Sequence, residues 1–360
     1  MLLLHAGGER RQVWRPVTAV LTDAGFRCVA FDQRGHGESG GTARTLAECA
    51  DDVAALIATE PGCVVVGASL GGLAAIAALA DPAVRKHVSG LVLVDVVPNL
   101  EPDRIRRFLA SRLGPHAELV EDILAHLPVL GKIDTPILLV RGGDGSVLTD
   151  ADVEGLRRAG PQVTVLRVPT AGHLIARDQP VRLAEAIEPA VDWPASHLLR
   201  ELGADAIAHP GGTVLDHLRR VHTLVSEWGA SPRLRLAALC HAAYGTDGRP
   251  HRLLPPHRRD RLRRAIGTDA ENLVYRYCSC ERRSTYARLG ARPLPLTDRF
   301  TGEVIELDGS DLADFAILTI ANEWDVARHA ARTEEVPGGI HELIEAFAVY
   351  APEAAARVLA

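Results

Sequence analysis

Hydrophobic positions recur along this chain with two different periods, one in each half. Up to about residue 190, short runs of apolar and β-branched residues alternate with stretches in which apolar positions recur every three or four residues. This alternation predicts a parallel sheet with helices on both of its faces. The predicted strands span residues 2–4, 27–31, 63–66, 90–94, 136–140 and 163–168, and the main predicted helices span residues 13–24, 46–59, 70–80, 150–159 and 180–190.

Strand patterns nearly vanish after Asp192-Trp193-Pro194, and Gly or Pro separates a series of helical stretches. These helices are predicted at residues 197–202, 213–228, 232–243, 258–266, 270–280, 310–333 and 339–349. Only residues 303–307 alternate as a strand does. The change of period therefore predicts two domains, an α/β domain at residues 1–193 and an all-α domain at residues 194–360.

The composition is typical of a soluble globular protein. A chain of 360 residues is long enough for two domains, and no apolar run approaches the ~18–20 residues that cross a bilayer. The apolar start at residues 1–4 is too short for a signal peptide, so we expect a cytoplasmic protein. The net charge of −6 argues against nucleic acid or a membrane surface as a general partner.

The six cysteines are too scattered for the disulfide framework of a small secreted protein, so we expect reduced thiols. Cys278 and Cys280 are close in sequence, but no second Cys or His pair follows at zinc-finger spacing. We expect both to be structural thiols.

A serine stands between a predicted buried strand and a predicted helix. The strand at residues 63–66 runs into Gly67-Ala68-Ser69-Leu70-Gly71, a G-x-S-x-G pattern, and the helix follows at once. In this context the pattern predicts a nucleophile elbow, a sharp turn that lifts the serine hydroxyl above the carboxyl edge of the sheet. The turn also places Ser69 at a helix N-terminus, which favours developing negative charge.

A serine needs a base within reach to become a good nucleophile. His173 lies in the loop that follows the last predicted strand, in Pro169-Thr170-Ala171-Gly172-His173. The order of serine followed by histidine suits a sheet of this kind. We therefore predict that His173 is the general base for Ser69.

Four segments resemble the α/β-hydrolase fold family, in its small-cap esterase and haloperoxidase-like branch. They are residues 2–8 (LLLHAGG), 31–39 (FDQRGHGES), 67–72 (GASLGG) and 171–173 (AGH), in the family's order. The resemblance implies that backbone N–H groups of Gly7 and Leu70 form the oxyanion hole, and that His36 is structural. It implies a small-molecule acyl substrate and no metal or organic cofactor.

Two aspartates are candidates for the acid that orients His173. Asp95 closes the apolar strand at residues 90–94, where a polar residue is hard to explain by packing. Asp144 lies in Gly143-Asp144-Gly145, one residue before the position that the family resemblance implies, and also suits a turn. We favour Asp95, because catalytic acids in this fold gather at the carboxyl ends of strands.

The sheet of the family normally begins with two strands ahead of the one that carries the oxyanion turn, and here that strand starts at Met1. Loss of edge strands would expose Leu2–Leu4. We therefore expect that the natural start of the chain lies farther upstream.

The resemblance also implies a small cap over the site, at about residues 98–133. Residues 101–113 and 117–127 predict two short amphipathic helices there. Their apolar faces include Phe108, Leu109, Leu124 and Leu127, which could roof a pocket.

The helical half loosely resembles the HD-type metal-dependent phosphohydrolases, with His217 on one helix, His241 at the end of the next and Asp314 on a later one. The aspartate that should follow the second histidine is replaced by Ala242. His217 and His222 lie about 140° apart around their helix, so they do not form a metal-binding pair. We expect a packed helical module without a metal.

Two further segments of this half carry weaker signals. Residues 236–248 and 270–280 resemble an uncharacterised bacterial helical domain. Residues 249–264 are rich in arginine and histidine, which predicts a solvated helix face, with phosphate or carboxylate binding as the alternative.

The sequence as a whole predicts a serine hydrolase of an ester, thioester or lactone, fused to a helical accessory domain. One alternative is haloperoxidase-like perhydrolysis by the same residues. Another is a non-catalytic or regulatory protein, in which the hydrolase half is a scaffold and the C-terminal domain does the work.

Overall fold

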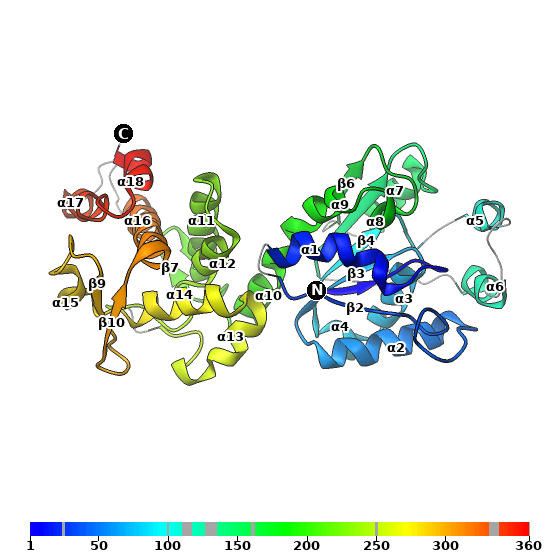
Figure 1. The fold of residues 1–360 in the computed structure, drawn as a ribbon, viewed down its shortest axis with the longest axis horizontal. Helices are drawn as coiled ribbons and strands as arrows, with labels where there is room; N and C mark the ends of the chain where they lie inside the picture. Colours follow the sequence, from blue (N-terminus) through cyan, green and yellow to red (C-terminus); the bar gives the residue numbers. More distant parts are fainter. Residues whose placement is uncertain are drawn as a thin grey trace. The chain divides into compact units, whose positions relative to one another are not determined.

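The structure is a computed structural model that describes residues 1–23, 26–98, 101–109, 117–126, 135–159, 163–248, 251–330 and 338–359. Contacts divide the chain into two units, Met1–Pro194 and Ala195–Ala360 (Figure 1). The first unit holds the predicted α/β pattern, and the second holds the predicted helical one.

The first unit is built on a six-stranded sheet in which every neighbouring pair of strands is parallel. Its order is β2-β1-β3-β4-β5-β6, so the strand that leads to Ser69 lies in the interior of the sheet. The strands are β1 (Leu2–Leu4), β2 (Val29–Phe31), β3 (Cys63–Ala68), β4 (Val88–Val94), β5 (Ile137–Gly142) and β6 (Val163–Val168). The predicted fold class is confirmed.

Helices cover both faces of this sheet, and successive side chains of β3 point into the apolar cores on opposite faces. Val64 and Val66 join the apolar core beneath α1 (Arg15–Asp23) and α9 (Pro180–Ile187). Val65 points the other way, into the core beneath α2 (Leu46–Thr59) and α3 (Leu70–Leu79). Strands buried on both faces explain why their sequences are apolar almost throughout.

The premise that Leu2–Leu4 would be exposed without further edge strands is wrong. β1 pairs with β2 on one side and with β3 on the other, and all three leucines are at most 1% exposed. The outer strand on this side is β2, whose residues are only half-buried.

The second unit is largely helical, as predicted. α11 (Val214–Glu227), α12 (Pro232–Cys240), α14 (Thr268–Ser279) and α16 (Gly309–Ala330) pack against one another around buried residues such as Phe315. The other helices of at least five residues are α10 (Trp193–Glu201), α13 (Arg259–Ile266), α15 (Arg282–Tyr286), α17 (Gly338–Phe347) and α18 (Pro352–Leu359). Among the described residues, no helix has the length and apolar character needed to cross a membrane.

Two short antiparallel hairpins add to the helices of the second unit. β7 (Ala208–His209) pairs with β8 (Gly212–Thr213), and β9 (Leu294–Thr297) pairs with β10 (Val304–Leu307). The predicted strand at residues 303–307 is therefore present. Its partner escaped prediction because Pro295 lies inside it, and proline within a run usually indicates a loop.

A glycine in β4 should prove essential to the packing of the first unit. A Cβ atom on Gly90 would lie 1.8 Å from Cε3 of Trp193, so Gly90→Ala forces the indole ring or the strand to move. We expect a loss of about 1–3 kcal/mol in the free energy of unfolding, measured by urea denaturation.

Gly155 provides the matched control, because a Cβ atom there meets nothing within 4 Å. It lies in α7 (Asp150–Ala159), so Gly155→Ala should stabilise the unit by ~0.5–1 kcal/mol. Equal stability of the two variants would contradict the role of Gly90.

Candidate active site

Ser69 occupies a strained turn between β3 and α3. Its φ is 47° and its ψ is −113°, a backbone conformation that residues other than glycine rarely adopt. The turn is possible because the strand and helix cross very closely. A Cβ atom on Gly67 would lie 2.6 Å from Gly72 Cα, and one on Gly71 would lie 2.6 Å from Leu4 Cβ.

His173 meets both Ser69 and Asp95. It follows β6 and precedes α8 (Ile175–Asp178), so its loop leaves the sheet at the same edge as the elbow. His173 Nε2 lies 3.0 Å from Ser69 Oγ, and His173 Nδ1 lies 2.9 Å from Asp95 Oδ2. The three side chains form a continuous hydrogen-bonded line.

Asp95 is held as a buried carboxylate. It follows β4 directly, its φ is 50°, and it is 0% exposed. Its Oδ1 accepts hydrogen bonds from the Gly142 N–H (2.8 Å) and the Ser146 hydroxyl (2.6 Å), and its Oδ2 accepts a longer one from the Val147 N–H (3.4 Å). Donors on both oxygens fix the orientation of the carboxyl group toward His173.

Asp144, the alternative acid, lies outside this line. Its side chain is fully exposed, and its Oδ1 lies 3.5 Å from an Arg167 guanidinium nitrogen. The loop that contains it contributes hydrogen-bond donors instead, because the Ser146 hydroxyl and the Val147 N–H donate to Asp95. Gly143 must lack a side chain there, since a Cβ atom would lie 1.7 Å from the Pro169 carbonyl oxygen.

The predicted oxyanion pair also lies together. A Cβ atom built on Gly7 would lie 3.8 Å from Leu70 Cβ, which places the Gly7 turn beside the first residue of α3. His36 supports this turn, because the Gly8 N–H donates to His36 Nε2 at 3.0 Å. Asp32 supports it as well, accepting from the Arg11 N–H at 2.7 Å.

Two family models match this chain. Residues 1–130 match the model of the alpha/beta hydrolase family, and residues 198–282 match that of a domain of unknown function, DUF6817. The N-terminal unit has the α/β-hydrolase fold.

Individual proteins are also similar to this chain, each over about half of its length. The chain is 26% identical to 2-(acetamidomethylene)succinate hydrolase of Mesorhizobium japonicum over 53% of this chain and 87% of that protein. It is 28% identical to an esterase of Mycobacterium tuberculosis over 53% of this chain and 82% of that protein. A solved esterase of Thermogutta terrifontis superposes with a TM-score of 0.43 at 25% identity, covering 54% of this chain and 89% of that one.

The segment predicted as the cap of the α/β-hydrolase contains two helices, α5 (Pro102–Leu109) and α6 (Ala117–Ala125). Leu124 is buried. Leu127 and the side chains of Phe108 and Leu109 lie outside the described residues. The Leu46 N–H donates to Asp122 Oδ2 at 2.7 Å, which ties α6 to the start of α2.

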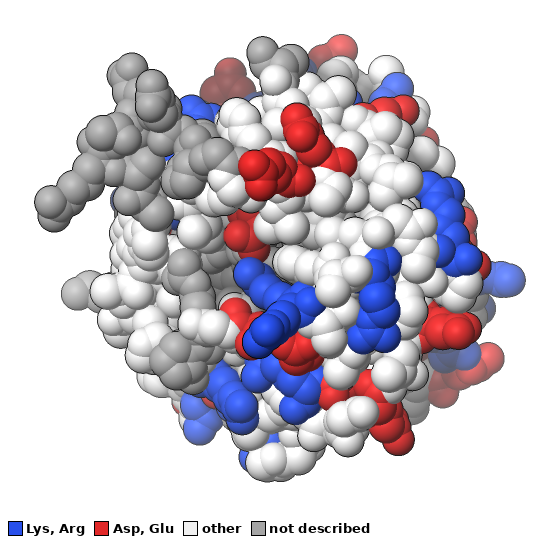
Figure 2. Space-filling model, turned by 90° about the vertical axis from the view of Figure 1, so that its left-hand side faces the viewer, with Lys and Arg blue, Asp and Glu red and all other residues white. Residues whose placement is uncertain are grey.

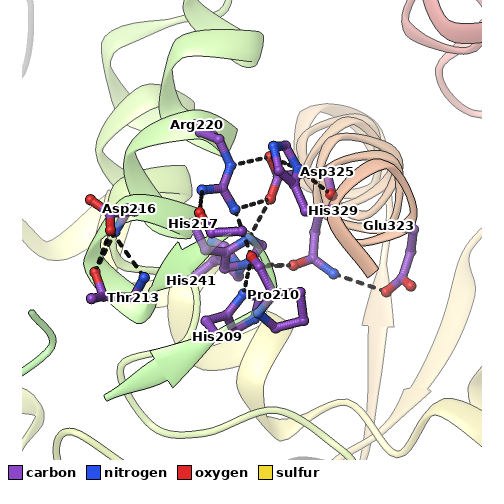
Figure 3. Close-up of polar contacts among 12 residues, drawn as sticks. His209, Pro210, Thr213, Asp216, His217, Arg220, His241, Glu323, Asp325 and His329 are labelled. Atoms are coloured by element: carbon purple, nitrogen blue, oxygen red, sulfur yellow. Dashed lines mark hydrogen bonds and ion pairs between the residues drawn. The ribbon is translucent and has the colours of Figure 1, made fainter. Parts of the chain in front are cut away.

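In the second unit, the structure brings two of the three metal candidates together. His217 on α11 and His241, directly after α12, have their Nε2 atoms 3.1 Å apart (Figure 3). Burial, followed by the neighbouring His217, lowers the pKa of His241 to about 3. Among the described residues, no three His, Cys, Asp or Glu side chains are placed to hold a metal ion together.

Asp314 does not join these histidines. Its Oδ2 faces Arg233 Nε at 3.6 Å, and burial raises its pKa. The α16 residue that contacts both histidines is Asn322, which lies ~12 Å farther along the helix axis, and Asp325 of the same helix contacts His217. A signal for it was present, because Asn322 and Asp325 are spaced as neighbours on one helix face in a largely apolar stretch.

The basic segment is less solvated than predicted. Arg259 and Arg263 both donate to the carboxylate of Glu271, which is 0% exposed, and the Arg259 guanidinium lies over the Tyr275 ring at 3.9 Å. These arginines compensate a buried charge. On the face drawn in Figure 2, basic and acidic side chains lie interspersed.

All six cysteines are free thiols, and Cys49, Cys278 and Cys280 are buried. Burial raises the pKa of Cys49 and Cys280 to about 11 and that of Cys278 to about 12. At pH 8 the thiolate fraction of each is therefore about one part in a thousand or less.

We expect iodoacetamide to leave Cys49, Cys278 and Cys280 unmodified in the native chain and to alkylate them in urea, as measured by peptide mass spectrometry. Native alkylation of Cys278 at the rate of a free thiol would contradict this.

Proposed function

We propose that the α/β-hydrolase unit is a serine hydrolase that cleaves an ester, thioester or lactone of a small molecule through an acyl-enzyme. The observation that carries this proposal is the line from Asp95 through His173 to Ser69, with contacts of 2.9 and 3.0 Å. The carboxyl edge of a parallel sheet, a helix N-terminus and a buried aspartate meet at this line.

In the first half of the proposed reaction, His173 Nε2 accepts the proton of Ser69 as Oγ attacks the acyl carbonyl carbon. The N–H groups of Gly7 and Leu70 donate to the oxygen that becomes negatively charged. When the tetrahedral intermediate collapses, the alcohol or thiol leaves with the proton from His173, and the acyl group stays on Ser69.

In the second half, His173 takes a proton from water, whose oxygen attacks the acyl-enzyme carbonyl carbon. Collapse returns the proton from His173 to Ser69 Oγ and releases the carboxylic acid. Asp95 holds the His173 ring with Nδ1–H toward itself and stabilises the imidazolium that forms twice in each cycle. The names of the relatives, an esterase and a hydrolase, support chemistry of this kind.

A fluorophosphonate probe tests the nucleophile directly. We expect the wild-type chain to be labelled at Ser69, because His173 raises the nucleophilicity of its hydroxyl, and Ser69→Ala to remain unlabelled. Intact-mass spectrometry measures both. A wild-type chain that stays unlabelled would sink the serine-hydrolase proposal and favour the non-catalytic alternative.

The two aspartates make a matched pair of variants. Asp95→Asn should lower kcat by about 10³- to 10⁴-fold, because the amide favours the wrong tautomer of His173. Asp144→Asn, at a fully exposed position, should stay within about twofold of wild type. Hydrolysis of a p-nitrophenyl ester that the wild type accepts provides the assay, and comparable losses in both variants would overturn the assignment.

A further inference from the structure

The second unit contains a cavity of about 300 Å³ that is lined by apolar, polar and charged side chains. His217, His241 and Asn322 lie side by side in that lining, and they come from three different segments of the helical packing. His217 is 2% exposed, His241 1% and Asn322 6%. Nothing in the proposed hydrolase reaction uses these side chains.

Three atoms of these side chains form a nearly equilateral triangle. His217 Nε2 lies 3.1 Å from His241 Nε2 and 3.1 Å from Asn322 Oδ1, and His241 Nε2 lies 2.9 Å from Asn322 Oδ1. Polar atoms at such distances need a proton or a cation between them, because otherwise their lone pairs repel.

The other ring nitrogens show where the imidazole protons lie. His241 Nδ1 lies 2.7 Å from the Ala238 carbonyl oxygen, which can only accept, so Nδ1 carries the proton. His217 Nδ1 lies 2.7 Å from Asp325 Oδ2, and Arg220 donates to both oxygens of that carboxylate. In the neutral rings, both Nε2 atoms therefore present lone pairs to the triangle.

Asn322 is oriented by its neighbour on the same helix. Its Nδ2 donates to Glu323 Oε1 at 2.9 Å, which leaves Oδ1 turned toward the histidines. An extra proton on His217 would satisfy the two contacts of that ring. It would still leave His241 Nε2 and Asn322 Oδ1, two acceptors, 2.9 Å apart. One cation satisfies all three atoms at once.

We propose that His217, His241 and Asn322 bind one first-row divalent transition-metal ion such as Mn²⁺, Fe²⁺ or Co²⁺. An ion ~2.1 Å from each of the three atoms would see them at angles of about 90°, the facial arrangement of a six-coordinate ion. Imidazole and amide oxygen together suit these ions better than Mg²⁺, which prefers oxygen ligands alone.

The surroundings are those of a supported metal site with open positions. The chain from Arg220 to Asp325 to His217 has the form of a carboxylate–histidine pair, which orients a ligand and raises its basicity (Figure 3). His209 stacks on His217 with ring centroids 4.1 Å apart and holds the ring from its face. Since the cavity adjoins all three ligands, it can admit water or an oxygen donor of a small molecule to the remaining positions.

The test uses the full-length chain after treatment with a chelator. Isothermal titration with Mn²⁺ and with Co²⁺ should show one ion per chain and a rise in Tm, whereas Mg²⁺ should bind far more weakly. Bound Co²⁺ should show the weak visible bands of six coordination. Absence of binding at about 1 mM of either ion, or the intense bands of four coordination, would overturn the proposal.

Substitutions of the three side chains test whether they bind the ion. His217→Ala, His241→Ala and Asn322→Leu should each weaken Co²⁺ binding by about tenfold or more. His222→Ala, on the same helix as His217 but away from the cavity lining, and Ser69→Ala should leave it unchanged.

Asn322→Asp distinguishes a loss of Co²⁺ binding caused by a missing ligand from one caused by misfolding. It replaces the amide oxygen by a carboxylate oxygen, so it should bind Co²⁺ at least as tightly as the wild type. Circular dichroism of each variant checks the fold. Weakened binding by Asn322→Asp with a native spectrum, or unchanged binding by His241→Ala, would contradict the ligand set.

Discussion

The close crossing of β3 and α3 is the constraint on which the first unit depends. Gly67 lets the backbones of β3 and α3 approach to distances that no Cβ atom tolerates, Gly71 does the same for α3 and Leu4 of β1, and Ser69 takes a φ of 47° between β3 and α3. A serine in that conformation is held by the packed sheet beneath it, because β3 lies in the interior and is buried on both faces. Burial of apolar strands thereby supplies the rigidity that the proposed chemistry needs.

A parallel sheet gathers the other members of the site at the same edge. Asp95 follows β4 and His173 follows β6, so His173 reaches Ser69 and Asp95 reaches His173 although the three residues are far apart in sequence. The chain supports them with backbone groups and small residues, of which Gly142 is an example. The loop after β5 therefore contributes hydrogen-bond donors to Asp95, whereas its own Asp144 is exposed.

The second unit contains polar and charged groups inside a helical core, and these groups need partners. Glu271 is compensated by two arginines, and Asp325 by Arg220 and His217. The triangle of His217, His241 and Asn322 has no such internal compensation, because all three atoms accept. A buried polar cluster of this kind is costly unless a ligand completes it, which is why we infer a bound ion.

The sequence by itself determined the fold class, the elbow at Ser69 and the candidate base His173, since these follow from hydrophobic period and from local motifs. It left two acids open, because whether Asp95 or Asp144 turns inward depends on where the loop after β5 folds. Only the tertiary structure placed Asn322, rather than Asp314, beside the histidines of the second unit. Local pattern shows which face of a helix is buried, but the turn of that helix that meets a partner is decided by how the whole unit packs.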